Sequence, residues 1–453
     1  MVANWSEIQE DILDFLAIRV PLDAKEIARF RSVCKPWKSA VIDAKRRSMP
    51  FAPCLILHNR SNDRLITPDN EEEAIRSFYC FSTKQLFHFC FPSQGRRCWG
   101  TPYGWLFTMG YDLNINLFNP FSGSQISLPS QLTFPDKSWD CCKPHEVCRS
   151  YVLNFALASN PSSWTTSAAT PLVIAIYGGG RKLAFANPGD IAWTPLEESP
   201  NGNKDILFFN DNFYIVNMLG ALSVCDPNTT PLKATKISAP PSGVGLFNKF
   251  YLVEMFGDLH LVARRLNCID GNEDAGVLNA INGNEDAGVF NDGNEDADID
   301  EDEHENKVVQ EAEDNSESGG GDESESEDED VDVDVSESES EDGDYYYDLH
   351  YETVHFLVFK FNLHTREWTK MKNLGGHAIF VGNHISFAIS ASNYPDFRGN
   401  CIYFTDDHTE LYKYRFCDMG VYDMKRKTVE PIYTNDDKTS KFARPSFFMP
   451  TAK

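Results

Sequence analysis

The sequence predicts a mainly β protein, in which three short N-terminal helices precede a β-propeller of about six or seven blades interrupted by a disordered acidic insertion. Three observations carry this prediction. Near residue 50 the apolar residues change from helical spacing to a period of two. A strand–turn–strand unit recurs along the chain. A long internal segment is almost purely polar and acidic. We therefore expect four parts: 1–48, 50–269, 270–344 and 345–450.

The N-terminal helices are predicted from capping and spacing. Ser6 and Gln9 form a capping box, in which each side chain can satisfy a backbone N–H at the start of a helix. An apolar stripe at helical spacing follows. Pro21 interrupts it, and Lys35-Pro36 marks the start of a third helix, because proline suits a first helical turn.

Three helices in about 40 residues can bury only a small core, so part of the apolar face is expected to bind a partner. The pattern W-S-E-I-Q-E-D-I-L, V-P-L and R-F-R-S-V-C-K-P-W-K-S-A-V resembles the F-box, although Ile8-Gln9 stands where that family has Leu-Pro. The resemblance implies docking onto Skp1 and, through it, onto a cullin. The residues expected to bind Skp1 are Ile8, Ile12, Leu13, Phe15, Leu16, Val20, Pro21, Leu22, Val33, Cys34 and Trp37. The alternative is a generic helical cap on the next domain.

After residue 50, short apolar segments rich in aromatic and β-branched residues are bounded by Gly, Pro, Asn or Asp, which is typical of strands. The predicted strands are Cys54–His58, Leu86–Phe91, Gly104–Met109, Tyr151–Ala158, Leu172–Tyr177, Ile206–Phe209, Phe213–Asn217, Lys249–Met255, Leu259–Ala263, Val354–Phe361, Cys401–Phe404 and Val421–Met424.

Two stretches, Leu183–Leu196 and Val358–Met371, share an Asn six residues before Trp-Thr and predict a hairpin with a buried tryptophan. Weaker copies begin at Phe118, Cys225 and Val421. Units of four short strands that recur every 40–50 residues favour a propeller over the alternative, one or two β-sandwiches. The string Gly399-Asn400-Cys401-Ile402-Tyr403-Phe404 strengthens the prediction, because the region from about 50 to 450 resembles the KIB-type propeller of plant F-box proteins. That resemblance implies a propeller that binds the target protein.

Residues 270–344 hold 32 Asp and Glu and one basic residue, Lys307, so the remainder of the chain is nearly neutral. Dense like charge predicts disorder, and the segment reads as an enlarged hairpin loop within one blade. Ser324, Ser326 and Ser336 each precede an acidic residue by three positions and are possible phosphorylation sites. A calcium loop from Asp292 to Glu303 is disfavoured, because Ala297 replaces the required glycine.

Several classes of function are disfavoured. We expect no membrane span, no specific nucleic-acid binding, no metal and no cofactor. Cys142, His145 and Cys148 lack a second ligand pair for zinc, and Gly178-Gly179-Gly180 lacks the helix of a phosphate loop. With no secretory signal, the twelve cysteines read as reduced thiols in the nucleus, the cytoplasm or both.

The sequence therefore favours a non-catalytic, substrate-recognition subunit of an SCF-type ubiquitin ligase, which holds a target protein near the ubiquitin-loaded enzyme. The alternative is a scaffold that binds basic proteins through its acidic loop, without ligase activity. Salt separates the two, because acidic-loop binding weakens with ionic strength whereas apolar docking does not.

Overall fold

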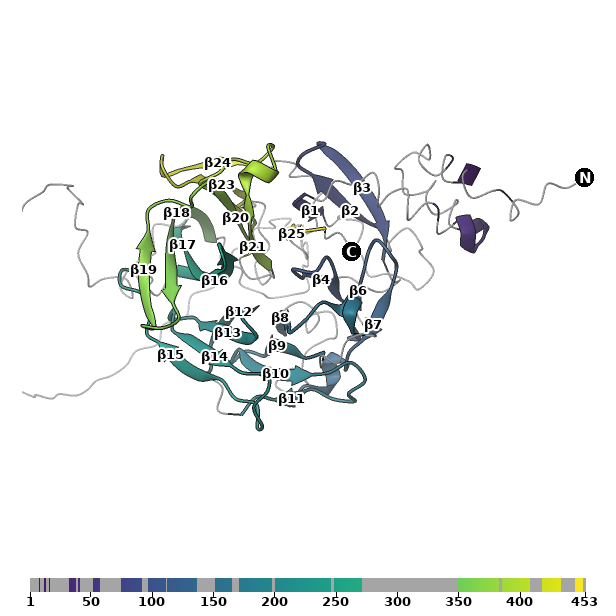
Figure 1. The fold of residues 1–453 in the computed structure, drawn as a ribbon, viewed down its shortest axis with the longest axis horizontal. Coiled ribbons are helices and arrows are strands. Elements are labelled where there is room, and N and C mark those ends of the chain that lie inside the picture. Colours follow the sequence, from purple (N-terminus) through teal and green to yellow (C-terminus); the bar gives the residue numbers. More distant parts are fainter. Residues whose placement is uncertain are drawn as a thin grey trace, which may run out of the picture. The chain divides into compact units, whose positions relative to one another are not determined.

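The computed structural model describes residues 8, 12–13, 16, 32–37, 40, 52–57, 75–91, 97–110, 112–136, 151–164, 171–197, 200–245, 248–270, 349–382, 385–407, 418–432 and 445–450. Between residues 52 and 450 these residues form six antiparallel or mixed sheets around a common centre, the arrangement of a β-propeller (Figure 1). Within the described residues, no helix combines the length and the apolarity that spanning a bilayer requires.

Each blade is one sheet, and its strands are given from the innermost outward. Blade 1 contains β25 (Ser446–Phe448), β1 (Cys54–Leu57), β2 (Ile75–Cys80) and β3 (Gln85–Cys90). Blade 2 contains β4 (Arg97–Gly100), β5 (Leu106–Met109), β6 (Ile115–Phe118) and β7 (Gln125–Ser127). Blade 3 contains β8 (Val152–Leu157), β9 (Val173–Tyr177), β10 (Lys182–Ala186) and β11 (Thr194–Pro195).

The second half of the ring is less regular. Blade 4 contains β12 (Asn203–Phe209), β13 (Asn212–Asn217), β14 (Leu222–Cys225) and β15 (Thr235–Ser238). Blade 5 contains β16 (Asn248–Met255), β17 (Asp258–Asp270), β18 (Leu349–Asn362) and β19 (Glu367–Met371). Blade 6 has five strands, β21 (Ile385–Ser390), β20 (His377–Gly382), β22 (Cys401–Phe404), β23 (Gly420–Asp423) and β24 (Thr428–Pro431). Short 3-10 turns lie at Gln131–Thr133, Pro161–Ser163 and Ala391–Asn393.

The hydrophobic core lies between the blades rather than within one of them. In β1, Cys54 and Ile56 pack into the core shared with blade 2, whereas Leu55 and Leu57 pack into the core shared with blade 6. Successive side chains of a strand point to opposite faces, so a strand with a neighbouring blade on each side is apolar at every position. Six such cores close the ring, one for each pair of adjacent blades.

The sequence repeat has a local physical cause. In blades 2, 4, 5 and 6 an Asn or Asp ends or directly follows the strand before the outermost one, and its side-chain oxygen accepts a backbone N–H two residues later, which forms an Asx turn. These residues are Asn119, Asp226, Asn362 and Asp423, with N–H to oxygen distances of 2.8–3.0 Å. In these four blades the repeated Asn or Asp therefore marks the turn into the outermost strand.

The predicted fold is confirmed. All twelve predicted strands coincide with observed strands, and the blade count is six. The sandwich alternative is excluded by the six separate sheets. One detail was wrong: Trp193 is buried, but Trp368 is only half-buried, because it lies on the outer strand β19 and its indole N–H donates to the Ala239 carbonyl at 3.1 Å.

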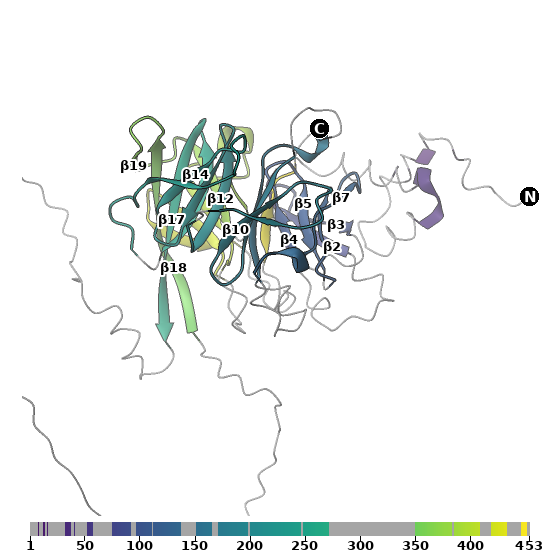
Figure 2. The same ribbon diagram turned by 90° about the horizontal axis from the view of Figure 1, so that it is seen from below.

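The sites described in the propeller lie at one face of the ring. The innermost strands β8, β12 and β16 begin at the same face, since Asp205 near the start of β12 bonds both Asn154 in β8 and the Leu252 amide in β16. The far ends of β17 and β18 lie at this face too, and Figure 2 shows that paired hairpin extending past the other strands. We call this face of the ring the start face. The connection from Asp270 to Leu349, which carries the acidic segment, leaves from here.

Candidate functional site

The N-terminal module is described at eleven residues. Helical backbone occurs on both sides of Cys34, which is itself not helical. Leu13, Trp37 and Ala40 pack together and are buried, with Ile8, Leu16 and Cys34 half-buried against them. Among the described residues of the module, three side chains therefore form a small buried core.

Four of the residues expected to bind Skp1 differ clearly in their exposure. Leu13 and Trp37 hold the module together from inside, whereas Ile12 and Val33 are 47% and 46% exposed. A large apolar side chain that stays exposed on a small module is available to a partner, whereas a buried one acts through the fold. Phe15, Val20, Pro21 and Leu22 lie outside the described residues, as do the three candidate phosphoserines, the Asp292–Glu303 loop and the Cys142–Cys148 cluster.

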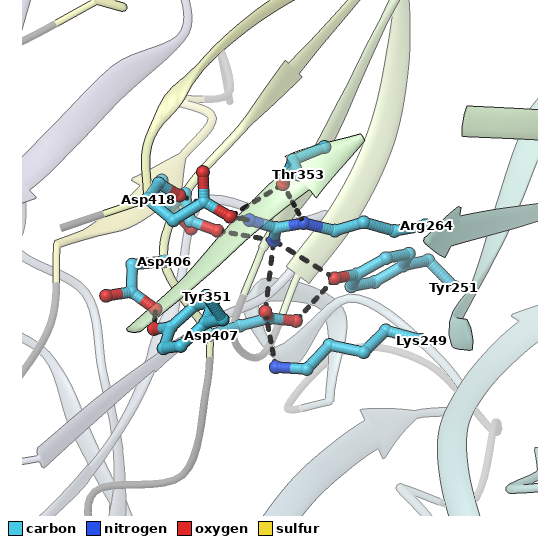
Figure 3. A network of polar contacts seen from close by, with 9 residues as sticks. Lys249, Tyr251, Arg264, Tyr351, Thr353, Asp406, Asp407 and Asp418 are labelled. Carbon is cyan, nitrogen blue, oxygen red and sulfur yellow. Dashed lines mark hydrogen bonds and ion pairs between the residues drawn. The ribbon is translucent and has the colours of Figure 1, made fainter. Parts of the chain in front are cut away.

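A network of polar side chains, drawn in Figure 3, joins blade 5 to blade 6 at the start face. Its centre is Arg264, whose guanidinium is fully buried. The Nε donates to Thr353 Oγ1 at 2.8 Å, Nη1 donates to the Thr405 carbonyl and to Asp407, and Nη2 donates to the carbonyl and the carboxylate of Asp418. All sides of the guanidinium fork are thus occupied.

The remaining members complete the cluster. Asp407 also accepts from Lys249 at 2.7 Å and from the Tyr251 hydroxyl, and Tyr351 donates to Asp406. The Thr353 hydroxyl donates to Asp418 at 2.7 Å. The ring of Phe404 lies 4.6 Å from the guanidinium carbon of Arg264, which adds a cation–π contact.

Burial and charge oppose one another in this cluster. Burial works to raise the pKa of Asp407, but Lys249 and Arg264 outweigh it and hold that pKa well below its ordinary value. Burial works to lower the pKa of Arg264, but Tyr251, Asp407 and Asp418 raise it. Asp407 is therefore held as a carboxylate and Arg264 as a cation.

The cluster joins blades 5 and 6 through charge-assisted hydrogen bonds. Every donor of Arg264 already has an acceptor inside the protein, so none remains for a ligand. Among the described residues, no group of His, Cys, Asp and Glu is arranged to hold a metal ion.

The Gly399–Asp407 string, which carries the resemblance to KIB-type propellers, positions two members of this cluster. A side chain at Gly399 would lie 2.9 Å from the Gly376 carbonyl, so only glycine fits. Asn400 adopts a positive φ of 60°, and its side chain accepts the Leu374 amide at 2.8 Å. The buried strand β22 follows and delivers Asp406 and Asp407 to the interface between the blades.

Sequence reasoning missed Arg264. Its one signal is a charged pair, Arg264-Arg265, at the end of an otherwise apolar strand, where an unpaired charge would be costly. The acceptors come from positions about 90 to 155 residues further along the chain, so spacing could not reveal them. The tripeptide Gly178-Gly179-Gly180 lies in the hairpin turn between β9 and β10.

Comparisons with known proteins agree with this architecture. Residues 78–423 match the family model described as KIB1-4 beta-propeller. The putative F-box protein At5g55150 of Arabidopsis thaliana is 22% identical over 440 residues, covering 95% of this chain and 93% of that protein. The F-box protein SKIP23 of the same plant is 24% identical over 295 residues, covering 61% of this chain and 68% of that protein.

Among solved structures, Hsv2 of Kluyvelomyces marxianus aligns with a TM-score of 0.26 and 12% identity, over 44% of this chain and 62% of that chain, a likeness too slight to support an argument. The family match, in contrast, covers most of the chain. The resemblance predicted from the Gly399 string and the N-terminal helices is thus confirmed, and the chain belongs to the KIB1-4 β-propeller family in the form found in plant F-box proteins.

Proposed function

We propose that this chain is the substrate-recognition subunit of an SCF-type ubiquitin ligase, in which the N-terminal helices bind a Skp1-type adaptor and the propeller binds the target. The observation that carries the proposal is the pair Ile12 and Val33, which are exposed, whereas the described residues Leu13, Trp37 and Ala40 of the same module are buried. The F-box names of the relatives support it.

The proposed mechanism is proximity. The adaptor links the chain to a cullin and hence to the ubiquitin-loaded enzyme, and the propeller raises the effective concentration of a target lysine beside it. The chain makes and breaks no bond in this scheme, and the Arg264 cluster, with its donors all satisfied internally, supplies rigidity only. We expect the protein to act in the nucleus, the cytoplasm or both.

A pull-down with purified Skp1 tests the proposal. We expect Ile12→Asp and Val33→Asp each to weaken Skp1 binding about tenfold or more, because a charge replaces an apolar contact at the centre of the interface. The propeller's melting temperature should not change. Leu13→Asp should also abolish binding, but through loss of the module's core.

The matched control is Val429→Asp, which places the same charge on the outer strand β24, at a side chain that is 38% exposed. It should bind Skp1 as wild type does. Equal recovery of Skp1 by wild type, Ile12→Asp and Val33→Asp would contradict the proposal. Binding to basic proteins that disappears in high salt, with no Skp1 recovery, would favour the scaffold alternative.

A further inference from the structure

A surface on the start face between blades 3 and 4 has the properties of a docking site. It begins at a β-bulge in the innermost strand β12, where the pairing with β13 shifts between Asn203 and Asp205. Lys204 is the extra residue of this bulge, and a bulge redirects the side chain that it carries. Its neighbours are fixed, since Asp205 bonds Asn154 at 2.7 Å and the Leu252 amide at 2.7 Å.

The backbone around Lys204 is a rigid platform. The Gly202 amide donates to the Gly180 carbonyl at 2.9 Å, and the side chain of Asn203 donates to the Arg181 carbonyl at 2.8 Å. The Met218 amide donates to the Gly202 carbonyl at 2.8 Å. Three segments from two blades, 178–181, 200–204 and 217–221, are therefore joined through their backbones.

Two cations, Arg181 and Lys204, lie on this platform. Among the described residues, no carboxylate forms an ion pair with Arg181 or Lys204, whereas nearby Lys249 is paired with Asp407. Burial, together with the charges of Arg181 and Lys249, lowers the pKa of Lys204 to about 8, and Asp407 offsets this only in part. Burial also lowers the pKa of Arg181. An incoming anion would relieve this repulsion.

Apolar surface adjoins the cations. Met218 and Leu219 form the tip of the β13–β14 turn and are 45% and 52% exposed. Met218 lies against Gly202, where an added Cβ would come within 2.9 Å of its sulfur. Cationic groups beside a flexible methionine and a leucine suit a ligand with both acidic and apolar groups.

We propose that this surface, made by Arg181, Lys204, Met218 and Leu219, binds an extended acidic segment of the ligase's target, with carboxylates at the two cations and an apolar side chain at Met218 and Leu219. The inference rests on the proposed function and names the partner that the propeller recognises. Arg181 can accept a carboxylate with two parallel hydrogen bonds, and Lys204 supplies a point charge beside it.

The chain's own acidic residues are the competing occupant. Residues 270–344 carry 32 Asp and Glu, and the strands that bracket them, β17 and β18, reach the same face. Charge alone therefore does not distinguish an acidic segment of another protein from the acidic segment of this chain. The preference for an apolar side chain and a deletion variant distinguish the two.

The test uses the full chain and two fluorescent peptides in 150 mM salt, one alternating Glu and Asp with a central Leu, the other with Ser in place of that Leu. We expect the Leu peptide to bind more tightly than the Ser peptide. The double variant Arg181→Met with Lys204→Met should weaken binding at least tenfold, and Met218→Ser with Leu219→Ser should remove the preference for Leu. Lys204→Arg should retain binding.

The matched control is Lys236→Met, which removes one exposed lysine from the outer strand β15 of the same blade and should leave affinity within twofold of wild type. Equal binding by wild type and the double variant overturns the proposal. Peptide binding that is seen only after deletion of residues 271–348 also overturns the proposal, because the chain's own acidic segment then occupies the surface. Skp1 recovery by the double variant should remain unchanged, so that failure at this surface is distinguishable from failure of the ligase assignment.

Discussion

Arg264 shows how one residue can join two blades. A buried guanidinium is costly unless all its donors are satisfied, and here the acceptors come from Thr353 in its own blade and from Thr405, Asp407 and Asp418 in the next. The cluster lies at the root of the β17–β18 hairpin, which carries the long insertion. It therefore holds the position of that hairpin against blade 6.

Replacing Arg264 with Met should be strongly destabilising. The substitution keeps the aliphatic bulk but leaves Asp418 without a cation in a buried site and Asp407 with Lys249 only, so we expect a loss of about 3–5 kcal/mol in unfolding free energy. Chemical denaturation measures it. Arg398→Met is the control, because the Arg398–Glu430 pair is exposed and should contribute below about 1 kcal/mol.

The pH dependence of that loss follows from Asp407. Its pKa is depressed in the folded protein, so the stabilisation is fully present above its unfolded-state value of about 3.9 and fades as pH falls below it. The difference in unfolding free energy between wild type and Arg264→Met should therefore be constant from pH 5 to 8 and should become smaller in acid. A difference that is negligible at pH 7 would mean that the cluster contributes no net stability.

Residue types that act locally could be predicted from the sequence, and those that act at a distance could not. Asn119, Asp226, Asn362 and Asp423 each bond their own turn, so their spacing along the chain was visible as a repeat. Arg264 and Lys204 depend on residues that the ring closure brings near. No periodicity records that proximity.

The same contrast holds for whole strands. Strands buried on both faces, such as β1 and β9, are continuous apolar runs and were predicted. The outer strand β24 is exposed at all four of its positions, so its sequence carried no apolar pattern that distinguished it from a loop. The three-residue strand β25 was missed for its length, although it supplies the inner edge of blade 1.

Removing β25 should open the ring. Three strands of blade 1 come from the start of the propeller, but its innermost strand, β25, comes from the C-terminal segment. In the pairing of β25 with β1, Phe448 lies opposite Cys54. Phe447 packs into the core between blades 6 and 1, and Phe448 into the core between blades 1 and 2. Losing a buried Phe typically costs about 3–5 kcal/mol, so losing both should leave blade 1 unfolded.

A chain that ends at residue 444 should therefore melt at least about 10 °C below wild type or fail to fold, as differential scanning fluorimetry would record. A chain that ends at residue 450 is the matched control, since it keeps β25 together with Met449, which packs beside it. A truncated protein with a wild-type melting temperature would show that closure by β25 is dispensable.

At the scale of the whole molecule, charge and fold are carried by different parts of the chain. The net charge of −27 arises from the stretch between β17 and β18, whereas the six blades derive their stability from apolar cores between neighbours. If these roles are separate, the acidic stretch can be removed without loss of the propeller. Residues Asp270 and Leu349 are direct partners in the sheet, so a two-residue Asn-Gly turn can join them.

Deleting residues 271–348 in this way removes 32 of the 68 acidic residues and one of the 41 basic residues, which changes the formal net charge from −27 to +4. We expect the melting temperature not to fall more than about 2 °C below that of wild type, because a shorter loop costs less conformational entropy to close and the pairing of β17 with β18 is kept. The variant should elute much earlier than wild type from an anion-exchange column, because its net charge is no longer negative. A large fall in melting temperature, with Skp1 binding intact, would show that the acidic stretch supports the propeller as well as giving the chain its charge.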